Sequence, residues 1–213
     1  MYDVILFDLD GTISDSAFGI INSISYALEK FNIEVQERSE LYKFVGPPLQ
    51  DSFIKYYNFN QEECDKAVYY FREYFKKQGM YENILYDGVE QLVRTLHDKG
   101  KCVMLATSKP EEFAIEILNY FHIAQYFDYI AGATMDGARR SKRDIITYAL
   151  QQKKISDLTS VVMIGDRAHD IWGAKEVGID SVGVLYGYGN RAELHEAGAT
   201  YIAERVEDII KYI

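Results

Sequence analysis

Short apolar runs alternate along this chain with segments whose apolar residues recur at helical spacing. The runs cover residues 4–7, 102–106, 129–131, 161–164 and 181–184. They are apolar throughout, as expected for strands that are buried on both faces of a sheet. Between them, stripes such as Val89, Leu92, Val93 and Leu96 occupy one face of a helix. This alternation predicts an α/β fold with a doubly wound parallel sheet.

One region interrupts the alternation. From residue 16 to residue 81 the pattern indicates helices only, with Ile21, Ile24, Leu28 and Phe31 at helical spacing. We interpret residues 16–81 as a helical cap inserted after the first strand. Residues 1–15 and 82–213 then form the core, and its ligands are expected beyond the carboxyl ends of the strands.

Composition and charge narrow the class of protein. Of 213 residues, 48% are hydrophobic, which is enough to build a core, and the net charge is −10. An acidic chain of this kind argues against a nucleic-acid surface, which requires clustered Lys and Arg. No run of apolar residues is long enough to span a membrane, and the start lacks a signal region. Two distant cysteines, Cys64 and Cys102, fit a cytoplasmic location.

Two acidic pairs follow predicted buried strands. Asp8 and Asp10 come directly after the first strand, and Gly11 permits a tight turn beyond them. Asp166 and Asp170 follow the strand at 161–164. Carboxylates brought together at a sheet edge repel one another unless a cation intervenes, and Mg²⁺ suits oxygen ligands. The alternatives are a turn with solvated acids for the first pair, and for Asp170 the N-cap of a helix beginning at Ile171.

Two further clusters supply hydroxyl groups and positive charge. Thr107 and Ser108 follow the strand at 102–106, where a hydroxyl and backbone N–H groups can hold a phosphoryl oxygen. Ordinary helix capping, with Pro110 in the first turn, is the alternative. Lys142 lies in a basic run after the strand at 129–131 and could neutralise phosphoryl oxygens. Basic runs are commonly solvated surface, and Arg139 or Arg143 could share its role.

In chain order these clusters resemble the four motifs of the haloacid dehalogenase superfamily. Asp8-Leu9-Asp10-Gly11-Thr12 resembles the first motif, Thr107 the second, Lys142 the third, and Asp166 with Asp170 the fourth. The resemblance implies a Rossmann-like core with an α-helical cap. Residues 44–49 and 187–189 are similar to members of the phosphoglycolate-phosphatase-like branch. Two departures are Arg143, where proline often follows the lysine, and Asp87, where proline often precedes the next helix.

This resemblance implies a Mg²⁺-dependent phosphatase. Asp8 is the expected nucleophile and Asp10 the acid and base, with Thr107 and Lys142 completing the catalytic set. Asp8, Asp10, Asp166 and Asp170 would hold the metal. Phosphate or substrate would be bound by a further set, Gly11, Thr12 and Ser108 in the core and Lys43 and Gly46 in the cap.

The expected substrate is a small phosphorylated metabolite, such as phosphoglycolate or a nucleoside monophosphate, bound by a monomer or homodimer. A pyrophosphatase is a variant of the same interpretation. A β-phosphoglucomutase-like enzyme would carry a His-x-x-Ala-Trp pattern in the cap, but the single tryptophan is Trp172. A dehalogenase would lack an acid at the position of Asp10. The alternative of another class is a non-catalytic module that binds phosphorylated ligands.

Overall fold

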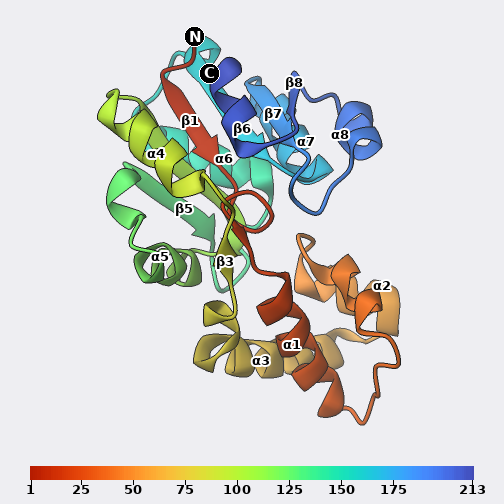
Figure 1. The fold of residues 1–213 in the computed structure, drawn as a ribbon. Helices are drawn as coiled ribbons and strands as arrows, with labels where there is room; N and C mark the ends of the chain where they lie inside the picture. The colour runs from red at the N-terminus through yellow and green to blue at the C-terminus, as the bar shows by residue number, and fades with distance from the viewer. The chain divides into compact units, whose positions relative to one another are not determined.

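A sheet of six parallel strands carries the first unit of the chain. In this computed structural model, which describes residues 1–213, the strand order is β5-β4-β1-β6-β7-β8 (Figure 1). The strands are β1 Val4–Phe7, β4 Cys102–Pro110, β5 Tyr129–Ala133, β6 Val161–Gly165, β7 Asp180–Val184 and β8 Tyr201–Ala203. The predicted doubly wound parallel sheet is confirmed. The sequence pattern did not predict the sixth strand, β8.

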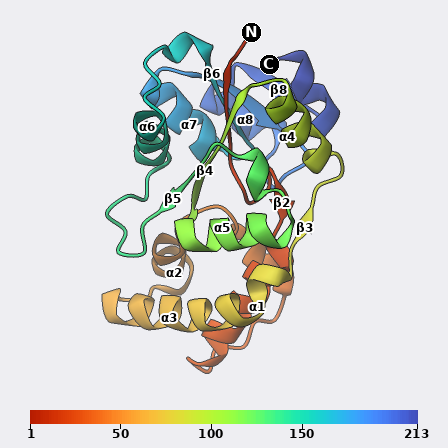
Figure 2. The same cartoon turned by 90° about the vertical axis from the view of Figure 1, so that its left-hand side faces the viewer.

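Helices cover both faces of this sheet. Successive side chains of a strand point to opposite faces, so Val4 and Leu6 of β1 pack into the cluster formed with α6 and α7. These two helices span Lys142–Gln152 and Ala168–Val177. The opposite face is covered by α4, Val89–Asp98, and α5, Glu111–Tyr120 (Figures 1 and 2).

The register of β1 places the first acidic pair beside the other candidate residues. Val4 lies opposite Cys102 of β4 on one side and Val161 of β6 on the other. The carboxyl ends of the three strands therefore meet at one edge of the sheet, the usual ligand edge of open α/β folds. The strand β1 ends at Phe7, and the Asp8 N–H still donates to the Ile164 carbonyl at 2.9 Å.

Short elements complete this unit. The helix α8 spans Arg191–Ala197, and the 3-10 helices are η3 Ala124–Tyr126, η4 Leu158–Ser160 and η5 Val206–Lys211. Of the apolar residues in η5, Val206 and Ile209 are buried, whereas Ile210 is 42% exposed. The tighter 3-10 turn explains this, because side chains at i and i+3 eclipse and a fourth position turns outward.

The second unit comprises residues 16–84, and the first comprises 1–15 and 85–213. The predicted boundary at residue 81 lies just inside the second unit. Its elements are α1 Ala17–Glu29, η1 Arg38–Phe44, α2 Leu49–Tyr57, α3 Gln61–Lys77 and η2 Gly79–Tyr81. A capping box between Asn60 and Glu63 begins α3. The two connecting segments carry β2, Ser14–Asp15, and β3, Ile84–Leu85, which form a separate two-stranded sheet.

Aromatic side chains and one close backbone contact hold the helical unit together. Phe53 lies 5.2 Å from Phe44 and 5.7 Å from Phe59, measured between ring centroids. Gly19 of α1 lies so close to η2 that a Cβ atom there would come within 1.9 Å of the Gly79 carbonyl oxygen. Only glycine permits that approach.

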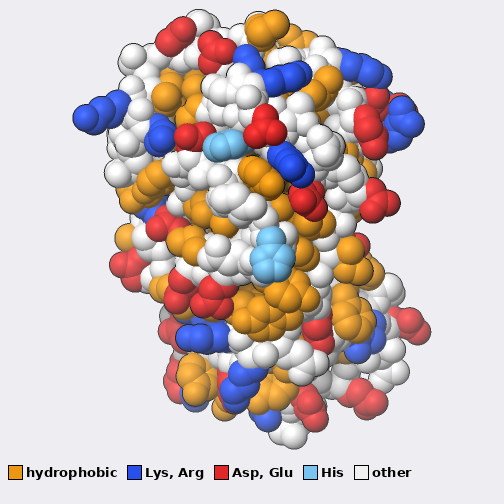
Figure 3. All heavy atoms as spheres, turned by 60° about the vertical axis from the view of Figure 1, so that its left-hand side comes forward, with side chains coloured by type: hydrophobic (Ala, Val, Ile, Leu, Met, Phe, Trp, Pro, Cys, Tyr) orange, Lys and Arg blue, Asp and Glu red, His pale blue; other side chains and the backbone are white.

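Figure 3 shows one face of the molecule with its charged and hydrophobic side chains coloured. Lys and Arg side chains are scattered there among Asp and Glu side chains. No helix combines the length and the apolar character that a membrane span would need.

Candidate active site

Asp8 and the turn after it form the first part of the site. Asp8 is 9% exposed, and Gly11 adopts the left-handed conformation at a φ of 86°. A Cβ atom at Gly11 would meet the Asp166 carboxylate at 2.3 Å. The glycine is therefore required twice, for the turn and for the approach of Asp166. The Thr12 hydroxyl donates to Asp166 Oδ1 at 3.3 Å, and its predicted contact with phosphate stays a prediction.

Asp166 is held from a second direction by the segment after β7. The Tyr188 N–H donates to Asp166 Oδ2 at 2.8 Å. Gly187 packs against the same carboxylate, because an added Cβ atom would come within 2.2 Å of the Gly11 carbonyl oxygen and 2.5 Å of Asp166 Cβ. The sequence interpretation used residues 187–189 only as a mark of resemblance. The structure shows that they touch Asp166.

Asp170 and Lys142 form a buried ion pair that reaches Asp8. Lys142 Nζ lies 2.7 Å from Asp170 Oδ1 and 2.8 Å from Asp8 Oδ1, and it donates to the Ala106 carbonyl at 2.9 Å. Burial opposes the charge on Lys142, but the carboxylates of Asp170 and Asp8 outweigh it and keep its pKa above the ordinary lysine value. Gly173 of α7 leaves the space that the lysine stem fills.

The alternative role of Asp170 as an N-cap is wrong. The helix α7 begins at Ala168, earlier than expected, so Asp170 lies inside its first turn. There its carboxylate accepts a hydrogen bond from the Arg167 N–H at 3.1 Å. A Cβ atom at Gly165 would meet the Asp170 carboxylate carbon at 2.2 Å, which explains why glycine ends β6.

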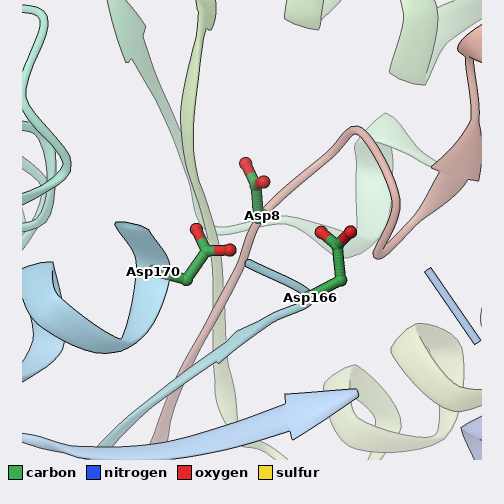
Figure 4. Close-up of side chains that lie close together, drawn as sticks. All are labelled: Asp8, Asp166 and Asp170. Atoms are coloured by element: carbon green, nitrogen blue, oxygen red, sulfur yellow. The ribbon is translucent and has the colours of Figure 1, made fainter. Parts of the chain in front are cut away.

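Asp8, Asp166 and Asp170 bring three carboxylates together (Figure 4). One oxygen atom from each lies within 4.8 Å of the others. Burial, followed by repulsion from Asp170 and Asp8, raises the pKa of Asp166 well above its ordinary value. Burial likewise raises the pKa of Asp170 to about 6, although Lys142 acts in the opposite direction. Three buried oxygen donors whose charges repel one another fit a divalent metal ion.

The segment after residue 106 differs from the predicted helix entrance. Thr107 and Ser108 belong to β4, and α5 begins only at Glu111, so helix capping by these residues is excluded. Between the pairs Ala106–Ala131 and Pro110–Ala133 the β4 chain bulges outward from β5. Bulges redirect side chains at sheet rims. The Thr107 hydroxyl, buried in this bulge, accepts a hydrogen bond from the Lys109 N–H at 3.2 Å.

Asp10 has a partner that sequence reasoning missed. Lys109 Nζ lies 3.1 Å from Asp10 Oδ2, and the lysine side chain is only 6% exposed. Lys109 directly follows Ser108 in the sequence. The direction of its side chain depends on the bulge in β4, however, and no local sequence pattern predicts that bulge. Asp10 itself lies outside the cluster of three carboxylates, so its predicted contact with the metal stays a prediction.

Arg139, one of the two arginines considered beside Lys142, binds residues that support the sheet. Arg139 donates from Nη2 to Glu111 Oε2 at 2.7 Å and from Nε to the Gly132 carbonyl at 2.9 Å. Arg143 is exposed. Neither is paired with Asp8, whereas Lys142 is, so the structure brings the lysine and not its neighbours to the predicted nucleophile.

Lys43 and Gly46 belong to the helical unit. The Lys43 ammonium lies 4.4 Å from the centroid of the Tyr56 ring, and Gly46 has a φ of 104° before the two prolines that precede α2. Their predicted contribution to substrate binding stays a prediction.

Comparison with known protein families identifies the family of this chain. A sequence profile described as haloacid dehalogenase-like hydrolase matches residues 5–184, most of the chain. This protein is a member of that family. The prediction of the superfamily is thereby confirmed, as is the predicted class of enzyme, a hydrolase acting on phosphoric monoesters.

Individual relatives of this haloacid dehalogenase-like hydrolase carry the names of a phosphatase, a nucleotidase and a kinase. A crystal structure of a predicted phosphatase from Clostridium acetobutylicum is 47% identical, with a TM-score of 0.95, over 99% of this chain and 97% of that one. A 5′-nucleotidase from Pseudomonas aeruginosa is 38% identical over 94% of this chain and 90% of its own length. The tyrosine-protein kinase PtkA from Mycobacterium tuberculosis is 37% identical over 93% of this chain and 67% of its own length.

Proposed function

We propose that this protein is a Mg²⁺-dependent phosphatase of small phosphomonoesters in which the Asp8 carboxylate attacks phosphorus. The observation that carries the proposal is the position of Asp8. It lies at the end of β1, within 2.8 Å of the Lys142 ammonium and beside the carboxylates of Asp166 and Asp170. A carboxylate next to buried positive charge can approach an anionic phosphate, which otherwise repels it.

The residues fit the metal that the family implies. Asp8, Asp166 and Asp170, with the backbone carbonyl of Asp10, would supply oxygen ligands only, which suits Mg²⁺. When bound, a divalent cation offsets repulsion between carboxylates and the phosphoryl group. The raised pKa of Asp166 reflects the same crowding of negative charge, because burial and the neighbouring carboxylates both oppose its ionisation.

The proposed reaction uses two aspartates. Asp10 begins this cycle as the carboxylic acid. An Asp8 oxygen forms a bond to phosphorus while the bond to the ester oxygen breaks, and the leaving oxygen takes the proton from the Asp10 carboxyl group, which becomes a carboxylate. Asp10 then takes a proton from a water molecule, whose oxygen attacks the aspartyl phosphate. The bond between phosphorus and Asp8 breaks, and inorganic phosphate and the free carboxylate result. Lys142, Thr107 and Ser108 would hold the phosphoryl oxygens during both steps.

The proposed substrate class rests on one relative and on two residues of the helical unit. The 5′-nucleotidase relative, at 38% identity over most of both chains, favours a nucleoside 5′-monophosphate, with phosphoglycolate as the next candidate. Lys43 and Gly46 are the residues that we propose contact the leaving group. Both cysteines are free thiols, and we propose that the enzyme acts in the cytoplasm.

A single substitution tests the nucleophile. Asp8→Asn should abolish release of phosphate from p-nitrophenyl phosphate in the presence of Mg²⁺ and leave the thermal unfolding temperature within a few degrees of wild type. Asp3→Asn is the matched control, because Asp3 lies just before the other end of β1 and is 75% exposed in its side chain. It should retain activity. Hydrolysis near the wild-type rate by a folded Asp8→Asn protein would remove Asp8 as the nucleophile.

Substrate and metal are tested in the same assay. Release of phosphate from adenosine 5′-monophosphate, phosphoglycolate and pyrophosphate, with Mg²⁺ and with EDTA, ranks the substrates and tests the metal requirement. Turnover of pyrophosphate above the monoesters would favour the pyrophosphatase alternative. A wild-type protein that releases no phosphate from any of these compounds would favour a non-catalytic binding module.

A further inference from the structure

Lys109 is a buried lysine that the reaction described above does not use. Buried lysines are rare, because the ammonium group loses its hydration unless a partner compensates. The partner here is Asp10, whose carboxylate Oδ2 lies 3.1 Å from Lys109 Nζ, with the two side chains 14% and 6% exposed. Because the pair is shielded from solvent, salt weakens its attraction much less than it weakens that of an ion pair at the surface.

The two buried lysines of the site bind different aspartates. Lys142 contacts Asp8, Asp170 and the Ala106 carbonyl. Lys109 contacts Asp10, the residue that would protonate the leaving group. The positive charge is therefore divided between the nucleophile and the acid, and Lys142 does not duplicate the contact that Lys109 makes.

The backbone of Lys109 is fixed on both sides. Its N–H donates to the Thr107 hydroxyl at 3.2 Å. On the other side, a Cβ atom at Gly132 would meet the Lys109 carbonyl oxygen at 2.7 Å, so the neighbouring strand supports the bulge directly. Glu111 secures that strand, because its Oε2 accepts hydrogen bonds from the Gly132 N–H at 3.1 Å and from Arg139. The lysine therefore reaches Asp10 from a rigid base.

We propose that Lys109 is a positioning residue that acts on the substrate through Asp10. This inference rests on the proposed phosphatase function. Lys109 holds the Asp10 carboxyl group toward the ester oxygen, and it remains beside the carboxylate once the proton has passed to the leaving group. No bond to Lys109 forms or breaks. The consequence of losing it should therefore depend on how strongly the leaving group needs a proton.

Two substrates of similar shape measure that dependence. Phenolate is a much stronger base than p-nitrophenolate, so phenyl phosphate needs the acid more than p-nitrophenyl phosphate does. Lys109→Met should lower kcat/KM for phenyl phosphate by about tenfold more than for p-nitrophenyl phosphate, within the range of acid–base contributions. Equal losses on both substrates would overturn the proposal, because a packing defect does not distinguish leaving groups.

A double-mutant cycle with Asp10→Asn provides the second readout. If Lys109 acts through Asp10, adding Lys109→Met to Asp10→Asn should cost less than about twofold in kcat/KM for phenyl phosphate, because residues that act as a unit are not additive. Losses that multiply would overturn the proposal. If Lys109→Met fails to fold, as judged by thermal unfolding, Lys109→Gln replaces it in the same cycle.

The controls separate this proposal from the proposed function. Lys101→Met removes another lysine–aspartate pair of the first unit, in which Nζ lies 2.9 Å from Asp3 Oδ1, and it should leave the ratio of the two substrates unchanged. If the wild-type protein hydrolyses neither the aryl phosphates nor the phosphorylated metabolites named above, the phosphatase function fails. If the wild type is active and Asp8→Asn is inactive, while Lys109→Met keeps the wild-type ratio, only the role of Lys109 fails.

Discussion

At the scale of single residues, two buried lysines compensate part of the negative charge of the buried carboxylates in the site. Asp166 and Asp170 cost free energy when they ionise without a metal, because burial and mutual repulsion disfavour their charges. Lys142 compensates the charges of Asp170 and Asp8, with which its ammonium group is paired. A metal-free protein therefore retains an electrostatic strain that should be measurable.

Because of Asp170, the free energy of unfolding of the metal-free protein should depend on pH. Its pKa is raised from 3.8 to about 6 in the folded chain, so the folded state retains the proton longer than the unfolded state. The stability that protonation provides is present in full below about pH 4 and is lost as the pH rises toward 6. In EDTA, the contribution of Asp170 to the free energy of unfolding should fall across this window.

The measurement is denaturant unfolding in EDTA from pH 4 to pH 7, compared with Asp170→Asn, which cannot ionise. The free energy of unfolding of the wild type should decline relative to the variant as the pH rises. Wild-type stability that rises relative to the variant over the same interval would contradict the raised pKa.

At the scale of elements, segments that pack on a functional residue position it. The segment between β7 and α8 is the clearest case, because Gly187 allows the chain to lie against Gly11 and Asp166. Tyr188 then donates its N–H to the Asp166 carboxylate. The segment thus orients a predicted metal ligand from outside the four motifs.

Gly187→Ala should consequently weaken the metal site. The new methyl group would lie 2.2 Å from the Gly11 carbonyl oxygen and must displace Asp166 or the turn. We expect a loss of roughly tenfold or more in Mg²⁺ affinity, as is typical when the support of a ligand is removed, measured by calorimetric titration.

Gly183→Ala is the matched control for that substitution. The atoms nearest to its methyl group would belong to the Leu194 side chain, the closest at 3.0 Å, and this side chain can shift. The control should bind Mg²⁺ like the wild type. Unchanged Mg²⁺ affinity in folded Gly187→Ala would show that this segment does not orient Asp166.

The packing of elements also explains which parts of the site could be predicted from the sequence and which could not. Asp8 and Asp166 were found because each directly follows a buried strand, and that is a local pattern. Lys109 was missed because a bulge in β4 determines its direction, and the bulge depends on Gly132 in a neighbouring strand. The start of α7 was misplaced because Asp170 satisfies the Arg167 N–H from within the helix.

At the scale of the whole molecule, the chain consists of two units with separate packing. The helical unit has its own aromatic cluster and the close contact between Gly19 and Gly79. The first unit has the sheet and the acidic residues. A destabilising substitution in one unit should therefore increase local unfolding first within that unit.

Gly19→Ala tests this separation. A methyl group 1.9 Å from the Gly79 carbonyl oxygen must push α1 and η2 apart, since neither backbone atom can yield locally. Amide hydrogen exchange should accelerate in residues 16–84, while β1, β4 and β6 keep their protection. Acceleration of equal size in those three strands would show that the two units unfold together.

The register of β1 also has a consequence for how the chain is made. As the ribosome extends the protein, β1 emerges first, but its neighbours begin only at Cys102 and Val161. The helical residues 16–84 are complete long before then and can organise by short-range contacts. An apolar strand that directly precedes the proposed nucleophile stays unpaired until then, so slow or interrupted translation before residue 161 should favour aggregation of this protein.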